Sequence, residues 1–259
     1  MTELVDQAAP FFLVVVRLSG IFIVSPLLGS SSILPRSKAL LAVGMAAAIY
    51  PSLPEHTRFP LDVSLFGLLP LIVLELLIGY VIGTVAALPA LGAQMGGQVI
   101  GYEMGLSLAQ SFNPELETNA DVIGQLFFFA GTTLFVISGG VDAMYSVLVA
   151  TFEMVPPGGF VTGMAPLELY LGSLNAAMEL ALRISAPVVA IALLSLLAMG
   201  FIMKSMPAMN ILAVGFAIKI LAGFAILIPA AGLLLSLAFE LQEDAVMELR
   251  RWAATLAEG

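Results

Sequence analysis

Six long stretches of the chain carry no charged residue, and this feature constrains the fold more than any other. They span 18–35, 39–54, 76–102, 122–141, 184–203 and 220–239, with 18, 16, 27, 20, 20 and 20 residues. A helix needs roughly 20 predominantly apolar residues to cross the hydrocarbon core of a bilayer. Five of the six stretches are long enough by count, so we expect five or six helices of the membrane type.

The overall composition agrees with a membrane protein and excludes two other classes. Apolar residues make up 60% of the 259 positions and charged residues 10%, and the mean hydropathy is +1.07. An ordinary globular domain carries roughly 25% charged residues, so this chain has too few polar groups to cover a water-exposed surface. We therefore exclude a soluble globular fold and a disordered chain. The sequence predicts an all-α, membrane-associated protein that forms one integrated domain.

Residue counts also limit the chemistry that the chain could perform. It contains no cysteine and a single histidine, His56, which excludes thiolate catalysis and metal sites built from cysteine or several histidines. The acidic segment 113–121 lacks the glycine that a calcium-binding loop needs, so we expect neither a metal nor a cofactor. A formal net charge of −9 disfavours binding to the phosphates of nucleic acids. The acidic first residues lack the basic region of a cleavable signal peptide, and none is predicted.

Prolines mark where the apolar stretches are expected to end. Pro26 interrupts the first stretch and Pro89 the third, because proline lacks the N–H group and clashes with the preceding turn of a helix. Three prolines within residues 51–60 exclude a continuous helix there. The segment 203–210 joins two apolar stretches by a short turn, and it predicts a C-terminal helical hairpin over about 180–245.

Glycine recurs at intervals of four residues between positions 75 and 114. The spacing places Gly79 and Gly83, and likewise Gly97 and Gly101, on one face of a helix. Small residues let another helix backbone approach closely, and lipid offers no hydrophobic reason for helices to associate. Ordinary packing within the chain and packing between subunits both remain open for any single pair. The repetition favours a surface covered by protein or lined by water, and these four glycines are our candidates for subunit packing.

Four charged residues lie within or beside the apolar stretches: Arg17, Glu75, Arg183 and Lys219. An unpaired charge in the bilayer core costs roughly 2.5–3.5 kcal/mol on insertion scales. We therefore expect these side chains to face the protein interior or a partner and to find counter-charges. A proton or ion relay is one hypothesis. Because arginine does not release its proton and Glu75 is the only acid of the four, a buried pair or an interfacial contact is favoured.

Several blocks of the sequence carry a resemblance to a known family. They are Arg17-Leu-Ser-Gly20, Leu34-Pro-Arg-Ser-Lys-Ala-Leu-Leu41, Glu75-x3-Gly79-x3-Gly83, Met95 to Ala109, Thr151 to Gly158 and Pro207 to Lys219. In this order, and over nearly the whole chain, they resemble the FliR family of flagellar export-gate proteins and their injectisome counterparts in type III secretion. The chain departs from the family pattern at Asn113, Ala208 and Lys204, where Asp, Gln and Arg are usual.

The resemblance implies a fold in two parts. These are a FliP-like helical part over 1–179 and a FliQ-like helical hairpin with a C-terminal tail over 180–259. A loop at 105–114 would plug the channel, with the candidate plug residues Gly105, Leu106, Ser107, Leu108, Ala109, Phe112, Asn113 and Pro114. The turn that contains Lys204, Pro207 and Asn210 would face the cytoplasm.

The same resemblance implies partners, a location and a function. One such chain would assemble with about five FliP-like and about four FliQ-like subunits, and with a FlhB-like switch protein at the cytoplasmic end. Exported flagellar proteins would be the substrates, and the assembly would lie in the flagellar basal body at the bacterial inner membrane. The expected function is that of a structural, pore-forming component of a protein export gate, not an enzyme.

Two other functions remain as alternatives. A secondary transporter for a small solute would carry paired broken helices around a midplane site, and the sequence holds no second copy of the pattern at 75–105. An intramembrane enzyme would need a compact set of protonatable groups, whereas His56 is isolated and cysteine is missing. The export gate is therefore the favoured function.

Overall fold

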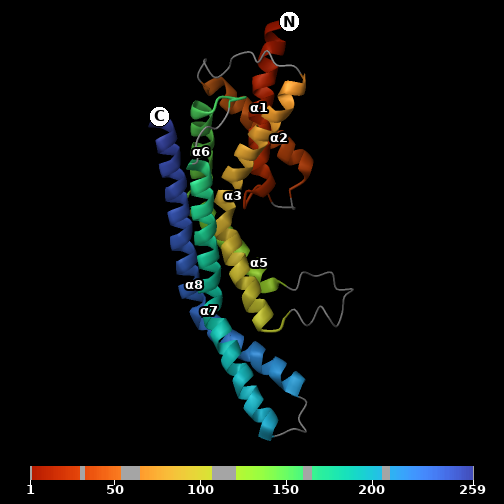
Figure 1. The fold of residues 1–259 in the computed structure, drawn as a ribbon, viewed down its shortest axis with the longest axis vertical. Coiled ribbons are helices and arrows are strands. Elements are labelled where there is room, and N and C mark those ends of the chain that lie inside the picture. Colours follow the sequence, from red (N-terminus) through yellow and green to blue (C-terminus); the bar gives the residue numbers. More distant parts are fainter. Residues whose placement is uncertain are drawn as a thin grey trace. The chain divides into compact units, whose positions relative to one another are not determined.

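The computed structural model describes residues 2–29, 33–53, 65–106, 121–159, 165–205 and 211–258. Within these ranges the chain forms α-helices and one short 3₁₀-helix, and it forms no strand (Figure 1). In chain order the elements are α1 (Thr2–Val24), α2 (Pro35–Ile49), η1 (Tyr50–Ser52), α3 (Leu65–Glu103), α5 (Val122–Ile137), α6 (Gly140–Met154), α7 (Ala165–Ser205) and α8 (Ile211–Glu258). The predicted all-α fold is confirmed.

Three helices in the described part of the chain are long and apolar enough to cross a membrane. They are Gly67–Glu103 of α3, Leu167–Ser205 of α7 and Val214–Arg251 of α8. A fourth span results if α5 and α6, which meet at a bend of 66°, count as one. This is fewer than the five or six helices that we expected. The first apolar stretch contributes residues 18–24 to the end of α1, and the second contributes residues 39–49 to the 15-residue α2. Fifteen residues are too few to span a membrane.

One of the two predicted proline interruptions is wrong. Helix α1 ends at Val24, just before Pro26, as predicted. Helix α3, in contrast, continues through Pro89 for 39 residues. A proline removes one backbone hydrogen bond from a helix and often bends it. Residues 82–90 are all buried, so packing against neighbouring helices stabilises the helical conformation on the N-terminal side of the proline.

The chain forms two compact units, each made of segments that are distant in the sequence. Unit 1 comprises Met1–Leu88, Phe135–Leu174 and Glu243–Gly259. Unit 2 comprises Pro89–Leu134 and Asn175–Gln242. Helix α3 therefore contributes its first part to unit 1 and its second part to unit 2. The linear division into FliP-like and FliQ-like parts rests on resemblance and stays a prediction.

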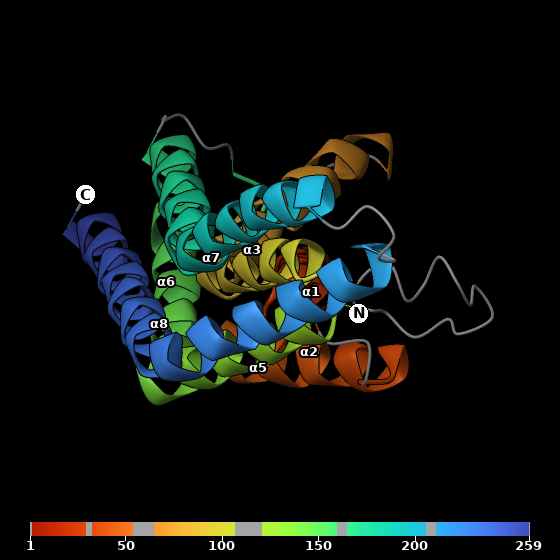
Figure 2. The same ribbon diagram turned by 90° about the horizontal axis from the view of Figure 1, so that it is seen from below.

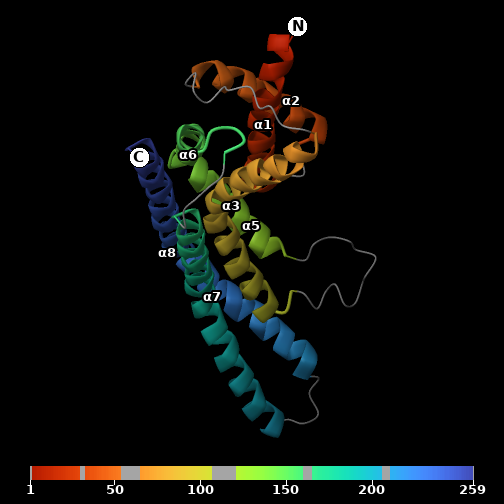
Figure 3. The same cartoon turned by 45° about the horizontal axis from the view of Figure 1, so that its top comes forward.

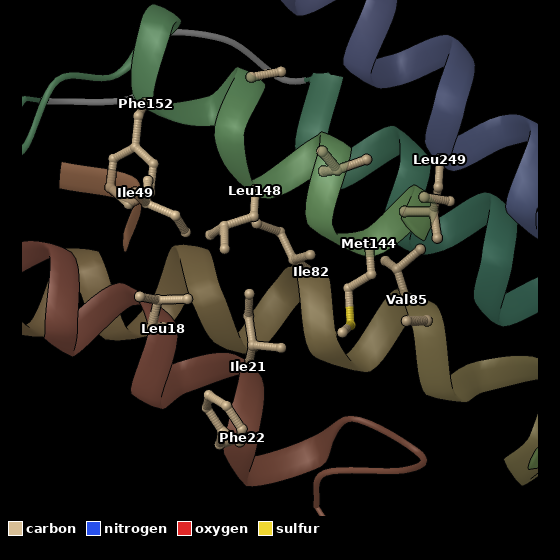
Figure 4. Close-up of a cluster of buried hydrophobic side chains, with 14 of the residues drawn as sticks. Leu18, Ile21, Phe22, Ile49, Ile82, Val85, Met144, Leu148, Phe152 and Leu249 are labelled. Carbon is tan, nitrogen blue, oxygen red and sulfur yellow. The ribbon is translucent and has the colours of Figure 1, made fainter. Parts of the chain in front are cut away.

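Unit 1 is built around the crossing of α1 with the first part of α3 (Figure 3). Helix α6 covers this crossing, and α2 adds a narrow stripe of buried residues at Ala42, Ala46 and Ile49. Burying one large aliphatic side chain stabilises a fold by roughly 1.5–3 kcal/mol. Figure 4 shows side chains of this core, which include Leu18, Ile21, Phe22, Ile49, Ile82, Val85, Met144, Leu148, Phe152 and Leu249.

Unit 2 contains most of the two helices of the predicted C-terminal hairpin. Leu180 and Ile184 of α7 lie in one buried cluster with Leu234 of α8. The second part of α3 joins the same cluster through Ile100 and packs against α5 (Figure 2). The segment of the predicted turn, 206–210, lies outside the described residues.

Candidate functional site

Glycines allow the backbones of α1 and α3 to touch in unit 1. A Cβ atom added at Gly79 would collide with the carbonyl oxygen of Arg17, and one added at Gly83 would lie 2.9 Å from the carbonyl oxygen of Ile21. On the other side of the crossing, a Cβ atom at Gly20 would collide with the carbonyl oxygen of Leu76. Such close approach is how small residues join helices when lipid supplies no hydrophobic drive. Gly79 and Gly83 thus contact a helix of their own chain.

Arg17 and Glu75 form a buried ion pair at this crossing. The Nε of Arg17 lies 2.5 Å from Oε2 of Glu75, and its Nη2 lies 3.1 Å from Oε1. The two side chains are 0% and 1% exposed. Two parallel hydrogen bonds between guanidinium and carboxylate form a strong and geometrically specific pair. Breaking a buried pair of this kind by removing one partner is strongly destabilising.

The C-terminal end of α6 supplies the remaining contacts of the pair. Arg17 Nη1 donates to the hydroxyl oxygen of Thr151 at 3.2 Å, and Nη2 donates to the carbonyl oxygen of Val155 at 2.8 Å. The N–H of Gly158 donates to Oε1 of Glu75 at 2.9 Å. The guanidinium carbon also lies 4.2 Å from the centre of the Phe152 ring, a distance typical of a cation–π contact.

We call these six residues the Arg17 cluster: Arg17, Glu75, Thr151, Phe152, Val155 and Gly158. The cluster ties α1, α3 and the turn after α6 to one another within unit 1. Arginine does not release its proton at accessible pH, so the cluster can bind the three segments together but is a poor proton relay. In the described part of the chain no three His, Cys, Asp or Glu residues gather as a metal site would require.

In unit 2, the glycine face of α3 also meets helices of the same chain. A Cβ atom at Gly92 would lie 2.5 Å from the carbonyl oxygen of Ala177 in α7, and one at Gly96 would lie 2.9 Å from the Cβ of Ile184. Gly97 faces α5, where an added Cβ atom would lie 2.7 Å from the Cα of Gly124.

Gly101 differs from the other glycines of this face. A Cβ atom added there would meet no heavy atom of the described residues within 4 Å, although Gly101 itself is buried. Large side chains near it in the sequence are exposed: Met95 by 44%, Val99 by 38% and Tyr102 by 69%. The described residues therefore leave these three side chains of the distal end of α3 uncovered.

Helix α3 ends in a defined turn at the start of the predicted plug. Gly105 has a φ of 78°. Its N–H donates to the carbonyl oxygen of Tyr102 at 2.9 Å, and the N–H of Leu106 donates to that of Gly101 at 3.0 Å. These two bonds and the left-handed glycine form a Schellman motif, which ends a helix and redirects the chain. The other candidate plug residues lie at 107–114, outside the described residues.

The remaining candidate residues are not brought together. Arg183 pairs with Glu179 at 2.5 Å on the surface of α7, where the two side chains are 55% and 58% exposed. It is therefore not buried within the chain itself. Lys219 is half-buried in α8. Lys204 is exposed at the end of α7, and Pro207 and Asn210 lie outside the described residues.

Residue-by-residue reasoning did not identify the partners that α6 offers to Arg17 and Glu75. These are Thr151, Phe152, Val155 and Gly158, and none of them carries a charge that would mark it. A signal was nevertheless present. They lie within the block Thr151 to Gly158 that carries part of the family resemblance, as Arg17 and Glu75 lie within two other such blocks. Blocks that are far apart in the sequence thus meet at one buried cluster.

Comparison with known proteins gives the same family. Residues 8–244 match the family described as "Bacterial export proteins, family 1". The chain is 28% identical to the flagellar biosynthetic protein FliR of Escherichia coli (strain K12) over 253 residues, which cover 92% of this chain and 93% of that protein. It is 26% identical to FliR of Bacillus subtilis (strain 168), with 88% of each chain covered.

A relative from a different system has a similar degree of identity. The secretion system apparatus protein SsaT of Salmonella typhimurium is 26% identical over 201 residues, which cover 76% of each chain. Neither the description of the family nor the names of these relatives is that of an enzyme. Because the family match extends over nearly the whole sequence, this chain belongs to the bacterial export proteins of family 1.

Proposed function

We propose that this chain is a membrane-embedded, non-enzymatic component of a type III protein export gate. The family match over residues 8–244 is the observation that carries the proposal. Relatives named for flagellar biosynthesis and for a secretion apparatus support it from two systems that both export proteins. The long apolar helices α3, α7 and α8 support a location in a membrane.

Within that role, we propose that the chain helps to form and seal the export channel together with FliP-like and FliQ-like subunits. One copy would join about five FliP-like and about four FliQ-like chains, with a FlhB-like switch protein at the turn that follows Lys204. The exposed side chains of Met95, Val99 and Tyr102 support a contact with another subunit at the distal end of α3.

The proposed plug, residues 105–114, would follow directly from the end of α3. The Schellman motif at Gly105 supports this because it turns the chain away from the helix axis at the first residue of the proposed plug. The site of assembly would be the bacterial inner membrane. A flagellar basal body is favoured over an injectisome, since the relatives from Escherichia coli and Bacillus subtilis, which cover 92% and 88% of the chain, are named for flagellar biosynthesis.

Native mass spectrometry tests this proposal directly. The chain is co-expressed with the FliP-like and FliQ-like proteins of the same organism and extracted in mild detergent. We expect a heteromer that contains one copy of this 27.1 kDa chain. A monomer or homodimer that binds neither partner would contradict the proposal, and solute transport would then be assayed instead.

Two leucine substitutions separate assembly from folding in the same experiment. We expect the variant Gly101→Leu to fold, because a Cβ atom added at this position meets no atom of the described residues within 4 Å. It should lose the heteromer if another helix packs on Gly101. Gly172→Leu is the control, since a Cβ atom added at Gly172 in α7 likewise meets no atom of the described residues within 4 Å. Equal recovery of the heteromer from both variants would remove Gly101 from the interface.

A further inference from the structure

The C-terminal end of α8 lies against the junction of α5 and α6 in unit 1. Val246 and Leu249 of α8 are 3% and 0% exposed. They belong to the same buried cluster as Phe135 from the last turns of α5 and Met144 from α6. The exposed side of this part of α8 carries charged residues such as Glu243 and Glu248, so this end of the helix is amphipathic and its apolar side is the one that packs.

Gly139 forms the junction of α5 and α6. It adopts a left-handed backbone with a φ of 77° immediately before α6. Its N–H donates to the carbonyl oxygen of Val136 at 3.2 Å, and its own carbonyl oxygen accepts from the N–H of Ala143 at 3.1 Å. One residue therefore closes the last turn of α5 and opens the first turn of α6. A left-handed conformation is strained for residues other than glycine.

The guanidinium of Arg250 occupies the place that a side chain of residue 139 would take. A Cβ atom added at Gly139 would lie 3.0 Å from Nη2 of Arg250. Arg250 follows Leu249, whose burial fixes this turn of α8 against the core. The side chain of Arg250 as a whole is exposed, so its guanidinium covers Gly139 from the surface of unit 1.

We propose that residues 243–251 of α8 act as a strap that fixes the left-handed turn at Gly139, where α6 begins, with Arg250 as a positioning residue over Gly139. The strap residues Val246 and Leu249 anchor the segment in the core of unit 1, and the guanidinium holds the backbone of Gly139 in its left-handed conformation. This role does not depend on the proposed export function, because every contact involved lies within the chain.

Hydrogen exchange followed by mass spectrometry on the full chain in detergent tests the strap. The variant Arg250→Ala should raise the exchange rate of the amides at 138–143 by about twofold, the usual size of effect for an exposed side chain, because the guanidinium no longer covers the backbone of Gly139. Amides of α3 near Ile82 should keep their wild-type rates. A loss of overall stability would raise both sets together, and that result would overturn the positioning role.

The neighbouring arginine provides a matched control. Arg251 is 73% exposed and pairs with Glu248 at 3.5 Å, so Arg251→Ala removes the same charge one residue away. It should leave the amides at 138–143 unchanged. If Arg250→Ala does not fold, Arg250→Lys keeps the charge but not the planar group, and it should give an intermediate rate. Wild-type rates in either Arg250 variant would overturn the proposal.

A double variant tests the contact itself. Gly139→Ala strains the backbone and displaces the guanidinium, so it should also raise exchange at 138–143. If the two groups act on each other, the combined variant Gly139→Ala/Arg250→Ala should raise exchange by less than the product of the two single effects. An exact product would show that Arg250 and Gly139 are energetically independent, and the strap would be rejected.

Discussion

Each unit of the molecule contains an arginine–glutamate pair with the same shortest distance, yet the two pairs differ in almost everything else. In unit 1, Arg17 and Glu75 come from different helices, are 0% and 1% exposed and meet at 2.5 Å. In unit 2, Arg183 and Glu179 lie one turn apart on α7, also meet at 2.5 Å and are 55% and 58% exposed. The distance between the two groups therefore does not determine how much an ion pair contributes to stability. That contribution depends on burial and on the number of further hydrogen-bond partners.

The same contrast holds for the apolar surface. In the most apolar window of α3, 56% of the residues are buried, whereas the corresponding windows of α7 and α8 are 11% buried. The apolar surface of helix α3 is thus covered largely by contacts within the chain. Helices α7 and α8 present most of their apolar residues outward, to lipid or to other subunits. An exposed ion pair on α7 is costly against lipid, which favours a protein partner for that part of its surface.

Removing Glu75 should produce the largest effect that this comparison predicts. Glu75→Ala leaves the guanidinium of Arg17 buried without its counter-charge, and we expect a loss of about 3–5 kcal/mol in the free energy of unfolding. Glu179→Ala should cost less, because Arg183 is 55% exposed and is not left buried in the chain without a counter-charge. Unfolding of both variants in detergent measures the difference. Equal losses would show that burial does not distinguish the two pairs.

A paired substitution sharpens the interpretation of that result. Replacing both charges with apolar residues of similar size, as in Arg17→Met/Glu75→Leu, removes the buried charge altogether. Such replacements are often neutral or stabilising, so the double variant should be more stable than Glu75→Ala. A double variant as unstable as the single one would show that the contacts to Thr151, Val155 and Gly158 contribute most of the stability.

Alanine at two glycines of α3 should have effects of opposite sign. At Gly79 the added Cβ atom collides with the carbonyl oxygen of Arg17, and overpacking of this kind costs about 1–3 kcal/mol. At Gly101 it meets nothing within 4 Å, and alanine favours a helix over glycine by about 0.5–1 kcal/mol. In thermal unfolding of the isolated chain, the Tm of the wild type should therefore lie between those of the two variants. A stabilised Gly79→Ala variant would contradict the tight α1–α3 crossing.

The smallest predicted effect concerns the start of α5. The N–H of Gly124 donates to Oδ1 of Asp121 at 2.9 Å, which makes Asp121 the N-cap of the helix. Asp121→Ala should cost about 1 kcal/mol. Asp142, in the first turn of α6, makes no cap of this kind, so Asp142→Ala should cost less. Circular dichroism during thermal unfolding compares the two variants, and a larger loss for Asp142→Ala would contradict the assignment of the cap.

The sequence predicted the fold class well because it depends on properties that are local in the chain. The charge-free stretches 76–102, 184–203 and 220–239 lie within the long helices α3, α7 and α8. Helix α1 ends just before Pro26, as expected for a helix breaker. The prediction that Pro89 interrupts a helix was wrong, because packing can offset the cost of one lost hydrogen bond and a single sequence does not reveal that packing. The number of spans was overestimated for a related reason, since α2 is apolar but has only 15 residues.

The candidate site was only partly accessible from the sequence. The cost of a charge in an apolar segment predicts that Arg17 and Glu75 need partners, but 58 positions separate them and no local rule joins them. The partners supplied by the end of α6 and the turn after it include two backbone groups, the carbonyl of Val155 and the N–H of Gly158. Every residue type except proline carries both groups, so the residue type gives no sign of these contacts. The glycine spacing predicted close contacts, while the helices that make them, α1, α5 and α7, could be identified only from the fold.

The composition of unit 1 has a consequence for how the chain is made. It combines residues 1–88, 135–174 and 243–259, so Leu249 reaches its buried position only after the other two segments have been translated. Domains generally fold as units while the ribosome extends the chain from the N-terminus. Here α1 and the first part of α3 are synthesised well before α8, which completes their unit. A nascent chain halted before residue 243 would expose the apolar surface that Val246 and Leu249 cover, which is a surface that cellular quality control could recognise.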